Sequence, residues 1–171
     1  MSDPSTPTVK LPDGLIIRHD LGPGDLGALV RLHGVLYARE YGYNPPFESY
    51  VAGPMAEFAL RGGPRQRIWI VEHRGEVAGC IAVVEASDDT AQLRWFLLAP
   101  EIRGRGLGRR LLTEAVAFCR EQGYRKAFLL TFAVHAEAAT LYRSLGFQVA
   151  GEHTGEFWGE VRTEQRYELT L

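Results

Sequence analysis

Hydrophobic positions recur every three or four residues between Leu107 and Cys119, which is the clearest periodic pattern in the chain. This spacing places them on one face of an α-helix, and Gly123 marks the expected end of that helix. Weaker patterns with the same period predict three more helices, at residues 26–42, 47–60 and 136–144.

Short runs rich in β-branched residues stand between these helical segments and predict a sheet. The expected strands are Leu15–Arg18, Ile68–Val71, Val77–Val84, Ala91–Leu98, Ala127–Phe132, Phe147–Gly151 and Arg166–Leu171. A turn-like segment separates the second and third strands, which are therefore expected to form a hairpin, and the fourth strand continues the antiparallel arrangement. The helix between the fourth and fifth strands is long enough to place those two strands parallel.

This order of elements predicts a single α/β domain of the mixed α+β kind. Its central sheet is mixed but mostly antiparallel, with about six or seven strands, and about four helices flank it. The domain is expected to cover residues 13–171. Residues 1–12 are rich in Ser, Thr and Pro and are predicted to form a flexible N-terminal tail.

Charge and cysteine content narrow the range of partners. A net charge of −2 gives no overall field that would draw the chain to nucleic acid or to an anionic membrane. No signal peptide or membrane-length apolar stretch is recognised, so a soluble cytoplasmic protein is expected. Cys80 and Cys119 lack CxxC spacing, which indicates buried free thiols and no metal site.

The segment Arg103–Arg109 is the strongest candidate for a ligand site. It lies between a strand and the start of the clearest helix, where unpaired backbone N–H groups and the helix dipole favour an anion. Its glycines let the backbone approach phosphate oxygens, and four arginines in and beside the segment add positive charge. The pattern suits a pyrophosphate, although a glycine-rich turn that serves only the path of the chain is the structural alternative.

Two other phosphate-binding motifs are disfavoured. A Walker loop requires GxxxxGK followed by Ser or Thr, and the chain has no such string. A dinucleotide fingerprint requires GxGxxG and an acidic residue at the end of the next strand, whereas the spacing here is GxGxG and that strand ends Leu130-Thr131-Phe132. Another kind of phosphate-ligand module remains the weakest alternative.

Two segments resemble the signatures of the GNAT N-acetyltransferases. Residues 98–112 resemble the coenzyme A motif of that family, with Arg103, Gly106 and Gly108 at its characteristic positions. Residues 138–147 resemble the second signature, a helix that ends in Leu-Tyr and is followed by Leu-Gly-Phe. Two motifs at the right separation are far more specific than either motif alone.

The resemblance covers roughly residues 15–171 and is strongest in the second half. Over residues 32–43 and at the C-terminus, the sequence most resembles the acetyltransferase domain that is fused to MarR-type winged-helix regulators. No winged-helix half is recognised in this chain. The resemblance therefore implies a free-standing acetyltransferase domain without nucleic-acid binding.

The resemblance also implies how acetyl-coenzyme A (acetyl-CoA) binds. The backbone of Leu97 and Leu98 would hold the pantetheine arm and polarise the thioester carbonyl. Tyr142 would donate a proton to the leaving thiolate, or its ring would only pack against the coenzyme. The pyrophosphate would be held by the backbone of Arg103, Gly104, Arg105, Gly106, Leu107, Gly108 and Arg109.

His135 departs from the family pattern, which usually has Asn at this position in contact with pantetheine. An imidazole there could contact the pantetheine arm, act as a general base, or cap the following helix. A capping or surface position is the favoured interpretation. Glu85, at the end of a strand, is only a weak candidate for the base, which stays unassigned.

An aromatic and acidic group at the end of the first helix is expected to bind the acceptor. This group consists of Tyr37, Glu40, Tyr41 and Tyr43, with Phe47 just beyond, and it could hold a cationic amine. An aromatic core patch with a solvated glutamate is the structural alternative. Trp158, within the segment Gly151–Glu160, is expected in a loop over the same cleft or at the edge of a homodimer.

These features predict an acetyl-CoA-dependent N-acetyltransferase. The acceptor would be a primary amine of a small molecule or a protein, and the transfer would be direct. A non-catalytic acyl-CoA sensor that signals to a partner is the alternative.

Overall fold

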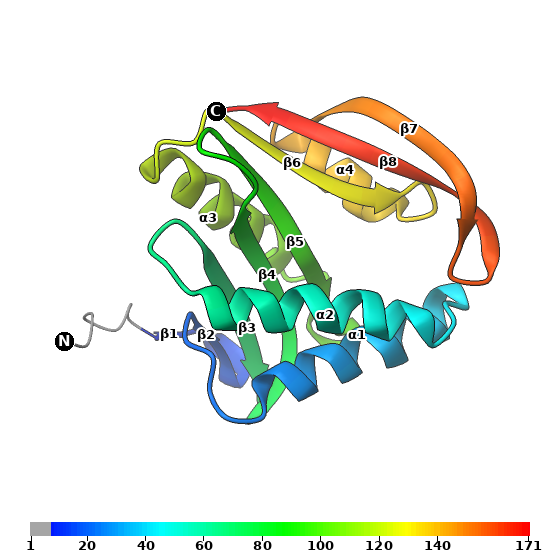
Figure 1. The fold of residues 1–171 in the computed structure, drawn as a ribbon. Coiled ribbons are helices and arrows are strands. Elements are labelled where there is room, and N and C mark those ends of the chain that lie inside the picture. Colours follow the sequence, from blue (N-terminus) through cyan, green and yellow to red (C-terminus); the bar gives the residue numbers. More distant parts are fainter. Residues whose placement is uncertain (1–7) are drawn as a thin grey trace.

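The computed structural model describes residues 8–171, which form one eight-stranded sheet covered by α-helices on both faces (Figure 1). The strands are β1 (Val9–Lys10), β2 (Leu15–Arg18), β3 (Arg67–His73), β4 (Glu76–Glu85), β5 (Thr90–Leu98), β6 (Lys126–Phe132), β7 (Gln148–Phe157) and β8 (Glu160–Thr170). The α-helices are α1 (Asp25–Tyr41), α2 (Pro46–Arg61), α3 (Leu107–Glu121) and α4 (Ala136–Ser144). The predicted mixed α/β fold class is confirmed, and each predicted helix and strand is present.

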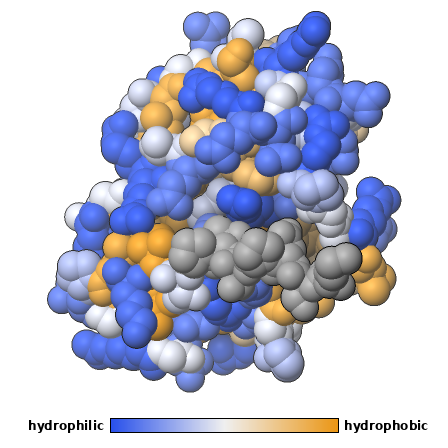
Figure 2. All heavy atoms as spheres, turned by 90° about the vertical axis from the view of Figure 1, so that its left-hand side faces the viewer, coloured by the Kyte–Doolittle hydropathy of each residue, from blue (hydrophilic) through white to orange (hydrophobic). Residues whose placement is uncertain are grey.

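The helices cover the sheet in two pairs. Leu111 and Leu112 of α3 belong to the core on one face, to which α4 also contributes. Leu29 of α1 and Met55 of α2 belong to a second core on the opposite face. Figure 2 views the molecule from the left of Figure 1 and shows a mostly hydrophilic surface with a few hydrophobic patches.

The sheet has the strand order β1-β2-β3-β4-β5-β6-β8-β7. β5 and β6 pair in parallel across the α3 crossover, as predicted, and the other neighbouring strands are antiparallel. The parallel ladder is very short, because it joins only residues 90–92 of β5 to residues 126–128 of β6. Beyond Gln92 the two strands separate, and this gap in the ladder creates the site described below.

The N-terminal segment contains more ordered structure than the sequence indicates. Val9–Lys10 forms β1, which pairs with Ile16 and Ile17 of β2. Both residues fall within the segment predicted to be a flexible tail. Residues 1–7 of that segment lie outside the described residues.

The C-terminal hairpin is longer than predicted. The segment Gly151–Glu160 was expected to contain a loop, but β7 continues through Phe157 and the chain reverses at Trp158 and Gly159. Both turn residues have positive φ, 55° and 95° respectively. Most side chains of β7 are exposed on both faces, so no hydrophobic alternation marks this strand in the sequence. Its ladder with β8 defines it instead.

None of the helices in the described part of the chain combines the length and apolar character needed to cross a membrane.

His33 is a titratable group buried in α1, only 2% exposed. Its Nδ1–H donates to the Leu29 carbonyl oxygen at 2.8 Å, while Nε2 is buried without a partner among the described residues. Burial lowers the pKa of the His33 imidazole to about 4. The folded state therefore holds a neutral imidazole where the unfolded chain would bind a proton.

We expect the folded state to lose stability as the pH falls from about 6.5 to 4. In this range His33 binds a proton in the unfolded chain but stays neutral in the folded protein. A shift of this size corresponds to about 3 kcal/mol of unfolding free energy at pH 4. Urea denaturation of the wild type and of His33→Leu at pH 7, 5.5 and 4 measures this contribution. The wild type should lose more stability than the variant, whereas parallel pH curves would contradict this role of His33.

Candidate active site

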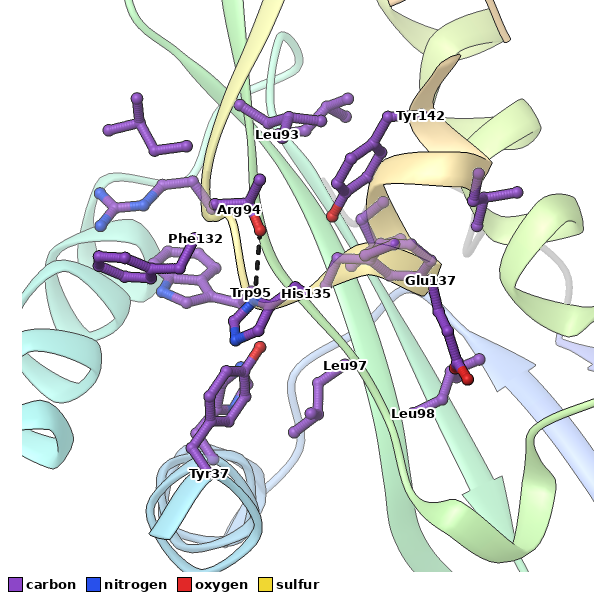
Figure 3. A pocket seen from close by; sticks show the side chains of 18 of the residues that line it. Tyr37, Leu93, Arg94, Trp95, Leu97, Leu98, Phe132, His135, Glu137 and Tyr142 are labelled. Carbon is purple, nitrogen blue, oxygen red and sulfur yellow. Dashed lines mark hydrogen bonds between the residues drawn. The ribbon is translucent and has the colours of Figure 1, made fainter. Parts of the chain in front are cut away.

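A cleft of about 540 Å³ opens where β5 and β6 separate (Figure 3). Its walls are the second half of β5, residues 129–132 of β6, the C-terminal part of α1, the first turns of α2 and the first turns of α4. β5 carries a bulge in this region, because its register with β4 shifts between Cys80 and Ala82. Trp95, within the bulge, has a positive φ of 52°. The bulge bends β5 away from β6 and widens the opening.

The exposed edge of β5 brings backbone groups to the cleft. Leu97 and Leu98 pair with Cys80 and Gly79 of β4 on one edge. Their other edge faces the cleft without a ladder partner in the described chain. Gly79 makes the close approach of β4 possible, since a β-carbon there would lie 2.6 Å from the Leu97 carbonyl oxygen. The sequence did not point to Gly79, because the need for a residue without a β-carbon there arises from the bulge in β5.

The segment Arg103–Arg109, called the glycine turn from here on, follows β5 in the chain and lies at one end of the cleft. Gly104 and Gly106 have φ of 74° and 75°, in the left-handed region that glycine tolerates best. Gly106 is the N-cap of α3, and no side chain caps the helix. Backbone N–H groups of the first turn are therefore free to bind an anion. Gly104 and Gly108 both line the cleft, so turn and cleft are continuous.

The arginines of the turn differ in what they contact. Arg103 donates from Nε to the Leu98 carbonyl oxygen at 2.8 Å and forms an ion pair with Glu40 of α1 at 2.9 Å. Arg105 forms an ion pair with Asp13 at 3.0 Å. The guanidinium of Arg103 thus joins the end of β5 to α1. The ion pairs with Glu40 and Asp13 partly neutralise the positive charge that the sequence assigned to phosphate binding.

Tyr142 projects from α4 into the cleft (Figure 3). Its ring packs against Phe96 of β5 and against Phe147 and Tyr167, with centroid distances of 5.7–6.2 Å. The side chain is 6% exposed, and burial raises the pKa of its phenol above the ordinary value. Tyr142 is therefore a protonated phenol at neutral pH and can serve as a hydrogen-bond or proton donor.

His135 lies inside the cleft, and the interpretation that it caps α4 or sits on the surface is wrong. It occupies the N-cap position, but its side chain makes no capping hydrogen bond. Its Nδ1 is 3.2 Å from Thr131 Oγ1, and its Nε2 is 3.2 Å from the Tyr43 hydroxyl. Burial and the nearby Arg162 lower the pKa of the imidazole to about 4, so the ring is neutral at physiological pH.

The predicted acceptor residues come together in one aromatic wall. Tyr37 and Tyr41 lie 5.5 Å and 4.4 Å from the His135 ring, centroid to centroid. Both side chains are partly buried, and this burial raises the pKa of each phenol above its ordinary value. Glu40 also lines the cleft, but its carboxylate is already paired with Arg103. Trp158 does not line the cleft and packs against Phe47 and Tyr50 of α2.

Several cleft residues were not recognised from the sequence. Thr131 holds the His135 ring together with Tyr43, which was expected in the aromatic acceptor group, and Arg94 and Glu164 line the cleft as charged groups. Burial raises the pKa of the Glu164 carboxyl. Thr131, Arg94 and Glu164 stand in no sequence motif, and only the folding of β5, β6 and β8 around one opening brings them together.

A metal centre has no support among residues 8–171, which contain no group of three or more His, Cys, Asp or Glu side chains able to hold an ion. Cys80 and Cys119 are buried free thiols, as predicted.

Comparisons with known proteins place the chain among acetyltransferases. A family model described as the acetyltransferase (GNAT) family matches residues 35–147. The N-acetyltransferase YjgM of Escherichia coli K12 is 35% identical over 114 residues, which are 64% of this chain and 68% of that protein. The rat protein N-acetyltransferase family 8 member 3 is 34% identical over 99 residues, but the match spans only 43% of its length.

Solved structures share the fold at low sequence identity. An acetyltransferase from Streptococcus agalactiae superposes with a TM-score of 0.75 at 23% identity, covering 92% of this chain and 99% of that one. The yncA protein from Salmonella typhimurium, solved with acetyl-CoA, gives a TM-score of 0.74 at 19% identity, with 92% and 94% coverage. The match to the family model extends over more than half of the chain and includes both the glycine turn and α4. The chain therefore belongs to the GNAT acetyltransferase family.

Proposed function

We propose that this N-acetyltransferase moves the acetyl group of acetyl-CoA directly onto a primary amine of a small molecule or a protein. The observation that carries the proposal is the cleft itself, which begins at an uncapped helix N-terminus and continues past the unpaired edge of β5 to Tyr142. An elongated ligand with phosphates at one end and a reactive group at the other fits such a path. Acetyl-CoA has this form, and the yncA structure holds it in the same fold.

Backbone groups make most of the contacts to acetyl-CoA in this proposal. The N–H groups of Gly104, Arg105, Gly106, Leu107, Gly108 and Arg109 bind the pyrophosphate. The Arg103 N–H, expected to take part, instead donates to the Pro100 carbonyl oxygen at 3.2 Å. The unpaired edge of β5 at Leu97 and Leu98 hydrogen-bonds the pantetheine arm and polarises the thioester carbonyl. Arg103 acts indirectly, because it holds the Leu98 carbonyl and so orients the end of this edge.

The transfer then needs an uncharged amine and a proton donor. The amine nitrogen attacks the thioester carbon, a tetrahedral intermediate forms, and its collapse breaks the C–S bond. Tyr142 gives its phenolic proton to the leaving thiolate, and the proton lost by the amine passes to water. The phenol is later reprotonated from solvent. The higher pKa of a buried phenol makes this transfer uphill, so it depends on the close positioning that the aromatic packing supplies.

The wall of Tyr37, Tyr41 and His135 forms the acceptor side in this proposal. A neutral His135 with hydroxyl partners on both nitrogens is suited to position the acceptor or the pantetheine arm. With a pKa of about 4, it is too weak a base to remove a proton from an ammonium ion efficiently. A cytoplasmic location, assembly as a homodimer and kinship to regulator-fused domains remain predictions from the sequence.

Calorimetric titration with acetyl-CoA, CoA and ATP tests the proposal most directly. Acetyl-CoA should bind with micromolar affinity and more tightly than ATP, because the pantetheine arm contacts β5. Equal binding of ATP, or no binding of acetyl-CoA, would contradict the proposal and favour another phosphate-ligand module.

Replacing Gly106 by Glu should weaken acetyl-CoA binding about a hundredfold or more. The carboxylate would place negative charge and bulk in the phosphate turn, where the backbone N–H groups must face an anion. The affinity is measured by calorimetry.

Gly123→Glu is the matched control for this change. Gly123 also has a positive φ, 78°, and lies beyond the other end of α3 with open space around it. Both variants should lose about 1–2 kcal/mol of stability from left-handed strain. Only Gly106→Glu should lose the coenzyme, and equal affinities for the two variants would argue against the turn as the phosphate site.

Replacing Tyr142 by Phe should lower kcat about a hundredfold and leave acetyl-CoA affinity nearly unchanged, because only the proton donor is removed. Thiol release with a reactive amine measures the rate. Tyr124→Phe is the control, since the Tyr124 hydroxyl donates to the Arg65 carbonyl oxygen outside the cleft. A wild-type rate for Tyr142→Phe would show that Tyr142 is not the proton donor. It would support the alternative in which the ring only packs against the coenzyme.

A further inference from the structure

Arg94 is a partly buried cation in the cleft that the proposed transfer does not use. It extends from β5 toward the side of the cleft covered by α2 (Figure 3). Its guanidinium carbon lies 5.0 Å from the centre of the Trp95 ring and 6.0 Å from that of Tyr50 on α2. These two rings support the flat faces of the guanidinium, and its N–H edges remain available for an acceptor.

The other arginine of the cleft has a different role. Arg103 is held by Glu40 and by the Leu98 carbonyl oxygen. Arg94 forms no ion pair with a carboxylate within residues 8–171, and no acceptor hydrogen-bonds to it there. A partly desolvated guanidinium without a counterion is costly, and the cost is recovered when an anion binds.

The phosphates of the coenzyme are not suited to be this anion. Arg94 precedes Leu98 by four residues of β5, which span no more than about 13 Å because of the bulge, and the glycine turn lies farther along the chain beyond Leu98. Phe96, only two residues after Arg94, contacts Tyr142. Arg94 therefore lies near the reacting end of the cleft and on its α2 side, where the acceptor rather than the coenzyme would enter.

We propose that Arg94 binds the carboxylate of the acceptor, so that the acetylated substrate is a small amine carrying a carboxylate close to its amino group, as in an amino acid. The inference rests on the proposed acetyl transfer. A guanidinium matches a carboxylate through two parallel N–H···O bonds, which fixes the orientation of the acceptor as well as its affinity. With the carboxylate on Arg94, the neighbouring amine is directed toward Phe96 and Tyr142.

The remaining surfaces of the cleft agree with such an acceptor. Glu137 and Glu164 line the cleft and form no ion pair within the described part of the chain, so the cationic form of the amine also finds an opposite charge. Tyr50, which is 43% exposed, and Phe47 offer apolar area to a hydrophobic side chain.

Matched substrate pairs test the proposal. Rates of thiol release are compared for phenylalanine and phenethylamine, and for methionine and its decarboxylated amine, with the wild type and Arg94→Gln. The wild type should prefer the carboxylate member of each pair. Arg94→Gln should reduce kcat/KM about ten- to a hundredfold for the carboxylate member, mainly through KM, and by less than about threefold for the amine.

Arg67→Gln is the matched control. Arg67 of β3 also stacks on aromatic rings, with its guanidinium carbon 4.4 Å from the centre of Phe118, but it does not line the cleft. This variant should behave as wild type with every substrate. Equal losses for both members of a pair in Arg94→Gln, or a wild-type preference for the decarboxylated amines, would overturn the proposal.

A binding experiment separates this inference from the proposed function. N-acetylphenylalanine and N-phenethylacetamide are titrated into the complex with CoA, and binding is followed by calorimetry and by the intrinsic tryptophan fluorescence, to which Trp95 beside Arg94 contributes. Tighter binding of the carboxylate product, lost in Arg94→Gln, supports the subsite even if no free amine is turned over. Acetyl transfer to amines without any carboxylate preference would leave the proposed function standing and overturn the subsite.

Discussion

The early separation of β5 from β6 is the constraint on which the site depends. The parallel ladder ends at Gln92, so the backbone groups of β5 beyond this residue that face β6 have no strand partner. Such groups must be satisfied by a ligand or by water. The bulge at Trp95 turns this edge into the cleft, and Gly79 allows β4 to follow β5 closely. A molecule bound along this edge would take the place of a missing strand, so its recognition would depend on the path of the main chain more than on particular side chains.

Charged side chains around the opening are divided between holding the fold and meeting ligands. Arg103 joins β5, the glycine turn and α1, so it stabilises the shape of that end of the cleft. Arg162, with its side chain only 8% exposed, stacks on Tyr43 and donates to the Tyr41 carbonyl oxygen, which orders the aromatic wall. Arg94 stacks on Trp95 and Tyr50 but has no carboxylate partner among residues 8–171. Of the two arginines that line the cleft, it is therefore the one we propose for recognition of the acceptor.

Most of the fold could be predicted because its elements carry local signals. The apolar period of α3, the β-branched runs of β3 and β4 and the stop at Gly42 depend on residues close in sequence. The outer part of β7 could not be predicted, since it is exposed on both faces and its ladder with β8 is the only feature that defines it. β1 was missed for a similar reason, because two residues contain no period.

The sequence by itself determined the family, because the glycine turn and the Tyr142 helix are contiguous motifs whose signals are local. Only the tertiary structure decided which side chains meet. His135 reaches Tyr43 across 92 residues, and Arg103 reaches Glu40 across 63. No pattern in a single sequence encodes such pairings, since they follow from the packing of α1 and α4 on opposite sides of one opening. Burial then changed the chemistry itself, converting His135 from an expected surface residue into a neutral ring inside the cleft.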